Sequence, residues 1–187
     1  MEESTNLTGI LVALMFVTIV TMAVGNLLTF LSERLQARDA ARRDPLRLTW
    51  VGLLLLMSLN AFWQCVLILD VQTWVFTEFL FVILGACALF FASTSVPRFV
   101  EGGDPEDRED AMHRRTVFFA LIAGFMLWLV ALDMIFGIDS LALVVVQLGA
   151  AIVAGAMALG ASIARPLPAT LAFAALQFVS MGLSATL

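Results

Sequence analysis

Residues 50–95 read WVGLLLLMSLNAFWQCVLILDVQTWVFTEFLFVILGACALFFASTS and decide the fold of this chain. They contain two long apolar runs joined by the short polar turn Asp70-Val71-Gln72-Thr73. Both runs are continuous, rich in leucine and alanine, and lack the alternation of a membrane strand. A spanning helix needs about 20 apolar residues, so this stretch predicts two transmembrane helices.

The rest of the chain also consists mostly of long apolar runs. Of its 187 residues, 61% are hydrophobic and 13% are charged. A soluble domain of this size cannot bury that much apolar surface. We therefore predict an all-α polytopic membrane protein, formed by a single domain of six transmembrane helices. The predicted helices span roughly 7–31, 48–69, 74–96, 116–136, 141–163 and 167–187, and the longer linkers are 32–47, 97–115 and 164–166.

The positive charges give an orientation. All ten are arginines, and all lie in the three linkers on one side of the predicted bundle. The opposite turns and both termini carry none. The positive-inside rule therefore predicts that the linkers are cytoplasmic and that both termini lie outside. The first residues lack the basic region of a secretory signal.

The linker after the first run is rich in arginine. Arg34, Arg38 and Arg42 are spaced four apart and share one helical face, and Arg43 follows. We expect a helical extension that lies near lipid headgroups or binds a partner, before Pro45 interrupts the helix. Asp104-Pro105 is a typical helix start, so a further helix is expected to continue through Arg114-Arg115 into the fourth run.

Glu78 is the first candidate functional residue, because a carboxylate within an apolar run is costly. It shares a helical face with Gly85, and the nearest arginine of its own helix, Arg98, is about 30 Å away. Glu78 is therefore expected to be protonated, to face a hydrated cavity or to bind a cation. The structural alternative is a neutral carboxyl that bonds to Asn60 or Gln64 on the preceding helix.

Other polar residues extend this pattern. A polar path is predicted to include Glu78, Asn60, Gln64, Asp133, Gln147 and Asn26, with Asp70 and Asp139 at its outer mouth. All of these except Asn26 are expected in the middle or outer half of the membrane. For Asp133 a purely structural role is the alternative. Trp50 and Trp74, near opposite ends of their helices, are expected to be interfacial anchors.

Several classes of chemistry are excluded by the residue inventory. Without lysine there is no Schiff base, and a single histidine, His113, cannot provide two haem ligands. No metalloprotease or nucleotide-binding motif is present. The longest linker is too short for a catalytic domain. We expect no enzymatic activity, no cofactor or metal and no nucleic-acid partner.

An aromatic and apolar pattern from Trp50 onward, together with the first predicted helix and its arginine-rich exit, covers about two thirds of the chain. Its positions are Trp50, Phe62-Trp63, Trp74-Val75-Phe76, Phe79-Leu80, Leu84-Gly85, Val96-Pro97 and, after an acidic loop, Arg114-Arg115-Thr116-Val117-Phe118-Phe119. The pattern resembles a family of small, uncharacterised six-helix bacterial inner-membrane proteins. The chain departs from it at Ala86, where Pro is expected, and Glu78 is not part of the general pattern. The resemblance implies the fold and a bacterial inner membrane, but no activity.

These observations predict a small channel or transporter that passes protons or small cations, with Glu78 as the binding carboxylate. We expect it to lie in the lipid bilayer and to form a homo-oligomer. The alternative is a non-catalytic structural or signalling subunit that docks a partner through its arginine-rich cytoplasmic face.

Overall fold

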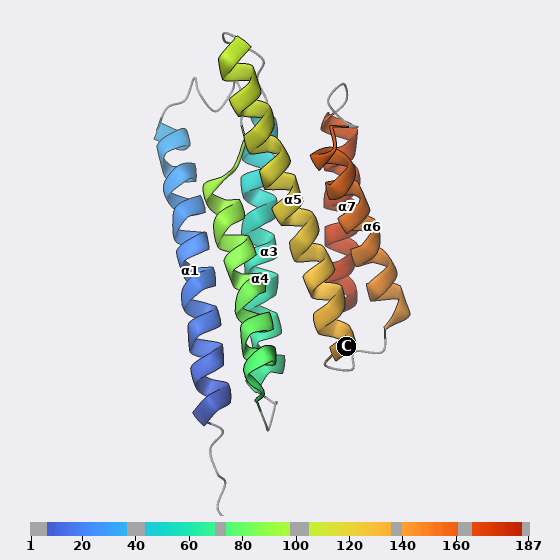
Figure 1. The fold of residues 1–187 in the computed structure, drawn as a ribbon. Coiled ribbons are helices and arrows are strands. Elements are labelled where there is room, and N and C mark those ends of the chain that lie inside the picture. Colours follow the sequence, from blue (N-terminus) through green and yellow to red (C-terminus); the bar gives the residue numbers. More distant parts are fainter. Residues whose placement is uncertain are drawn as a thin grey trace, which may run out of the picture.

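Six helices make up the computed structural model, which describes residues 7–36, 44–69, 74–97, 105–135, 140–160 and 166–184 (Figure 1). The described residues contain no strand. Each helix is long and apolar enough to cross a bilayer, so the chain is a multi-pass membrane protein and the predicted fold class is confirmed. The helices are α1 (Leu7–Gln36), α3 (Pro45–Leu69), α4 (Phe76–Thr94), α5 (Pro105–Ile135), α6 (Leu141–Ala158) and α7 (Pro166–Ser184).

Proline and capping side chains set several helix ends. Pro45 is the first residue of α3, and the carboxylate of Asp44 accepts a hydrogen bond from the Arg47 backbone N–H at 3.2 Å. The helix therefore starts earlier than the predicted residue 48. Helix α5 begins at Pro105 and continues through Arg114 and Arg115, as predicted. Helix α6 ends earlier than predicted and is followed by Gly160, whose φ of 79° suits glycine.

The helices pack in a ring-like order. Helix α1 packs against α3 and α4, α4 against α5, α5 against α6, α6 against α7, and α7 against α3. In Figure 1, α5 runs diagonally between a group formed by α1, α3 and α4 and the pair α6 and α7. The two groups therefore meet through α5 and also through the contact of α7 with α3.

Trp50 forms the centre of an aromatic core instead of an interfacial anchor. Its side chain is fully buried, and its ring centroid lies 5.5 Å from that of Phe118 and 5.0 Å from those of Phe119 and Phe173. The indole N–H donates to Thr170 Oγ1 at 3.2 Å. The predicted interfacial position of Trp50 is therefore wrong, because the residue faces α5 and α7 and not the lipid.

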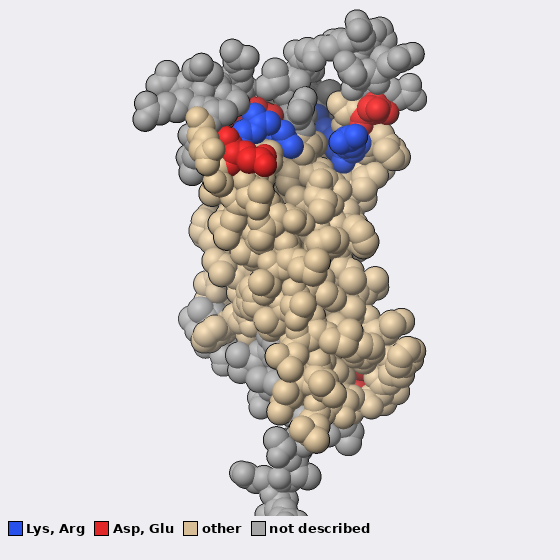
Figure 2. Space-filling view, turned by 90° about the vertical axis from the view of Figure 1, so that its left-hand side faces the viewer, with Lys and Arg blue, Asp and Glu red and all other residues tan. Residues whose placement is uncertain are grey.

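Charge is concentrated at one end of the bundle. Figure 2 shows the described basic side chains, with most acidic ones, gathered at one end and an uncharged middle on this face. The described helix ends nearest to the two termini, the start of α1 and the end of α7, lie at the opposite end (Figure 1). The described arginines thus follow the predicted one-sided distribution. Their guanidinium groups pack on rings in two places, Arg34 and Arg47 at 5.2 and 4.4 Å from the centroid of Phe30 and Arg115 at 5.9 Å from that of Phe119.

Candidate functional site

Asp133 and Gln147 form a buried polar pair between α5 and α6. Asp133 is 0% exposed and Gln147 is 1% exposed. The Gln147 side-chain amide donates a hydrogen bond to Asp133 Oδ2 at 2.8 Å. The two residues are equidistant in sequence from Ser140, whose hydroxyl accepts the Leu143 backbone N–H and so caps α6. The tight antiparallel packing of α5 and α6 therefore places them opposite one another.

Gln177 adds a third buried polar side chain at the same depth. It lies on α7, is 2% exposed, and neither its amide nitrogen nor its oxygen has a partner. The antiparallel packing of α6 and α7 sets this depth, because the Cβ position of Gly149 lies 3.5 Å from a methyl carbon of Leu176. Gln147 precedes Gly149 by two positions, and Gln177 follows Leu176 by one. The two amides therefore lie at nearly the same height along the bundle.

Several polar atoms at this level have no hydrogen-bond partner among the described residues. They are Oδ1 of Asp133, Oε1 of Gln147, and both polar side-chain atoms of Gln177. Buried polar groups are nearly always paired in folded proteins, and an unpaired one costs about 1–3 kcal/mol. The unpartnered oxygens of Asp133 and Gln147, which lie at one contact between α5 and α6, are therefore suited to hold water, a proton or a small ion.

No described arginine lies near Asp133 on its own helix. The nearest described arginine of its own helix is Arg115, 18 positions earlier, so the two lie about 27 Å apart along α5. An ionised carboxylate at membrane depth needs a neutralising partner. Amide and carboxylate oxygens are the ligands that hard cations prefer. The site can therefore be neutralised by a proton or by a small cation held by oxygen atoms.

Classical metal ligands do not gather anywhere in the described part of the chain. No group of three His, Cys, Asp or Glu side chains there could hold a metal ion. The free thiol of Cys87 is half-buried between apolar neighbours. The chemistry at the α5–α6 contact thus depends on the carboxylate of Asp133 and the amide of Gln147.

Glu78, predicted as the binding carboxylate, lies in the first turn of its helix. Helix α4 begins at Phe76, which makes Glu78 its third residue. Its Oε2 accepts the Val75 backbone N–H at 3.2 Å, and the Glu78 backbone N–H bonds to the Val75 carbonyl at 3.0 Å. The side chain is half-buried. Glu78 therefore already has a role in capping α4, since a carboxylate is favourable near a helix N-terminus.

The remaining polar candidates do not join the buried pair. Asn60 is buried on α3, but no hydrogen bond among the described residues links it to Asp133 or Gln147. Asn26 is exposed on α1 and donates to Ser93 Oγ at 3.3 Å, near the opposite end of α4 from Glu78. Among the predicted path residues whose side chains the structure describes, only Asp133 and Gln147 bond to one another.

Of the four arginines predicted to lie near lipid headgroups or to bind a partner, the structure describes Arg34. This residue is half-buried beside Phe30 at the charged end of the bundle. The other predicted site residues lie outside the residues or side chains that the structure describes; these are Asp70, Asp139, Arg38, Arg42, Arg43 and Gln64.

Gln177 is the residue that the sequence interpretation missed. The signal was present, because Gln177 is the only amide of the last apolar run. It also shares a helical face with Thr170, Phe173 and Ser180, and all four are buried. A lone amide on a face with small or hydroxyl-bearing residues indicates a side that is packed against protein.

The chain was compared with known proteins in three ways. No family model, no curated protein and no solved structure matches it. The resemblance to six-helix bacterial inner-membrane proteins therefore stays a prediction, and the functional argument depends on the geometry around Asp133.

Proposed function

We propose that this protein passes protons or small cations across a membrane, with Asp133 as the binding carboxylate. The observation that carries the proposal is the complete burial of Asp133 beside the neutral amide of Gln147, with one carboxylate oxygen unpartnered. This assigns to Asp133 the role that the sequence interpretation gave to Glu78. The class of function, a channel or transporter, is unchanged.

The hydrogen bond from Gln147 gives the two carboxylate oxygens different roles. Because the amide N–H of Gln147 already binds Oδ2, Oδ1 is the oxygen that takes up the proton or cation. The side-chain oxygens of Gln147 and Gln177 are buried and unpartnered at the same level. The Gln147 oxygen, on the residue that contacts Asp133, provides a neutral ligand for a cation, or an acceptor for a protonated carboxyl or a bound water.

Transport through this site requires a second conformation. Asp133 has no exposed surface in the observed structure, so its ligand cannot leave without a movement of α6 relative to α5. The Asp133–Gln147 hydrogen bond crosses that contact and is the interaction that such a movement breaks. With the arginine end cytoplasmic, the site lies closer to the outer surface.

The proposal is tested with purified protein in liposomes that contain a pH-sensitive dye or radioactive sodium. We expect wild-type vesicles to carry a flux, Asp133→Asn vesicles to match empty ones, and Glu78→Gln vesicles to keep the flux within about two-fold of wild type. A dye response without sodium uptake identifies the proton as the ion. Unchanged flux with Asp133→Asn would contradict the proposal, and no flux from folded wild-type protein would favour the docking subunit instead.

A further inference from the structure

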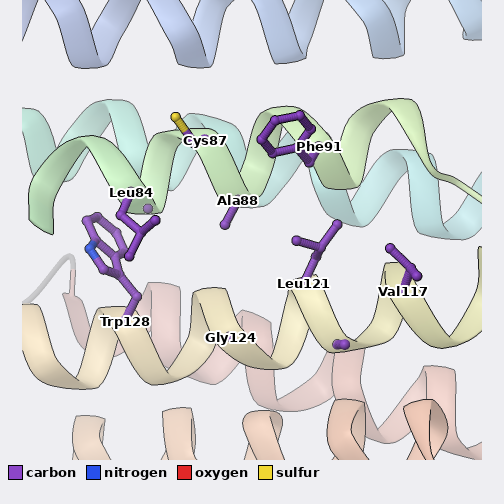
Figure 3. Close-up of a pocket in the computed structure, with 10 residues that line it drawn as sticks. Leu84, Cys87, Ala88, Phe91, Val117, Leu121, Gly124 and Trp128 are labelled. Carbon is purple, nitrogen blue, oxygen red and sulfur yellow. The ribbon is translucent and has the colours of Figure 1, made fainter. Parts of the chain in front are cut away.

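A groove lies between α4 and α5, on the side of α5 away from the polar pair. It has a volume of about 460 Å³ and an almost entirely apolar lining. In Figure 3, Ala88 of α4 and Leu121 of α5 face one another across the gap, and Trp128 stands at one end. The groove exists because small residues occupy both walls, and a Cβ at Gly124 would meet no atom within 4 Å.

The groove opens towards the bilayer. Leu84 is 64% exposed and Phe91 is 55% exposed along its α4 wall. Trp128, by contrast, is almost buried, and its indole N–H donates to the Phe81 carbonyl at 2.8 Å. At the Trp128 end of the groove, a hydrogen bond therefore joins α4 and α5. The side of the groove lined by the exposed Leu84 and Phe91 is open to lipid.

The length of the groove matches one leaflet. From Val117 to Trp128, α5 rises by about 17 Å, and half of a bilayer's hydrocarbon core is about 15 Å thick. Of the lining residues on α5, Val117 is the first along the helix and follows Arg114 by three positions, so it lies nearest to the charged end of the bundle. The groove therefore extends from the headgroup region of the leaflet at the arginine end towards the middle of the membrane.

A positive side chain stands at the headgroup end of the groove. Arg114 is exposed and lies one helical turn before Val117. Residues 114, 117, 121, 124 and 128 fall on one face of α5. An arginine at this depth can bind a lipid phosphate through two hydrogen bonds, and the charge favours anionic lipid.

We propose that this groove binds an anionic phospholipid of the leaflet at the arginine end, with an acyl chain along Leu121 and Gly124 and the phosphate on Arg114. The apolar walls of the groove, and its length of about one leaflet, favour an acyl chain. Arg114 selects the charge of the headgroup. The site does not depend on the proposed role of Asp133.

Native mass spectrometry of the purified full chain tests this site, with phosphatidylglycerol and phosphatidylcholine of identical acyl chains as the probes. Wild type is expected to prefer phosphatidylglycerol by about five-fold, the effect of one arginine near lipid charge. Arg114→Gln is expected to bind both lipids equally. Gly124→Leu fills the groove and is expected to lose the tightly bound lipid.

Gly52→Leu is the matched control, because Gly52 is also exposed on a helix with no atom near its Cβ position; it should behave as wild type. Equal binding of the two lipids by wild type, or unchanged binding by Gly124→Leu, would overturn the proposal. So would a Gly124→Leu protein that dissociates from an oligomer with its lipid binding intact, since a second copy would then occupy the groove. If Gly124→Leu does not fold, the exposed Arg114→Gln variant still decides the charge preference.

Discussion

Helix α5 makes two contacts of opposite character. Towards α6 it presents Asp133, which meets Gln147 in a buried polar pair with unpartnered oxygens. Towards α4 it presents Trp128, which packs over Gly85 and bonds to the Phe81 carbonyl. In the α4 contact, the indole N–H of Trp128 has a hydrogen-bond partner, and there is no room for a side chain larger than that of glycine at position 85. In the α6 contact, Oδ1 of Asp133 and Oε1 of Gln147 have no partner among the described residues.

This difference separates structure from function. Helices in lipid associate through close packing of small residues and through interhelical hydrogen bonds, and the α4–α5 contact has both. The α5–α6 contact carries a cost that packing alone does not explain. Sites that break the ordinary rules of burial are where function is expected.

The largest effect on stability is expected for Gly85→Leu. A Cβ at Gly85 would overlap the Trp128 ring, so the larger side chain forces α4 and α5 apart. Overpacking of this kind costs about 3 kcal/mol. Thermal unfolding in detergent measures it, with Gly52→Leu as the control for an added leucine on an open surface. An unshifted midpoint would show that α4 and α5 are not held together at this point.

A smaller loss is expected for Trp128→Phe. The change keeps an aromatic ring beside Gly85 but removes the indole N–H that donates to Phe81. The lost hydrogen bond costs about 1 kcal/mol. The Phe81 carbonyl lies within helix α4 and keeps its backbone partner. Unfolding of this variant beside Phe125→Leu, which removes a neighbouring ring without touching that bond, separates the hydrogen bond from ring packing.

Asp133→Asn is expected to change stability by less than about 1 kcal/mol, although it stops transport. An asparagine oxygen can still accept the Gln147 N–H, and replacing buried ionisable groups by neutral ones is often neutral or stabilising. The unfolding midpoint and the flux of the same preparation are measured together. A large loss of stability with this variant would place Asp133 among the structural residues and remove the contrast with Trp128.

The smallest effect is expected for Glu78→Gln. Glutamine can also accept the Val75 N–H at the start of α4, so only the interaction of the charge with the helix N-terminus is lost, about 0.5 kcal/mol. The midpoint should shift slightly and the flux should persist. Loss of flux at unchanged stability would return the transport role to Glu78.

The fold was largely predictable because composition leaves few alternatives. The six apolar runs, the one-sided arginines and the helix start at Pro105 all follow from local sequence. Trp50 was misplaced because an aromatic residue near a helix end has the same sequence signature whether it faces lipid or protein. Its burial depends on Phe118, Phe119 and Phe173, which come from distant helices.

The candidate site was only partly predictable. Asp133 and Gln147 were both recognised, and their equal distance from Ser140 would have indicated a contact across the α5–α6 hairpin. Glu78 lies in the first turn of α4, because the first helical residue is Phe76, two positions later than predicted. Gln177 was missed although it is the only amide of the last apolar run, because the sequence interpretation did not examine which polar side chains share a face on that helix.

The most direct test of the central claim is infrared difference spectroscopy of the protein in lipid as the pH is changed. The account predicts a protonated-carboxyl band that is present in wild type and Glu78→Gln, absent in Asp133→Asn, and shifted in Gln147→Leu, which lacks the amide that bonds to Asp133. A band that persists in Asp133→Asn, or that disappears in Glu78→Gln, would contradict the assignment of the binding carboxylate to Asp133.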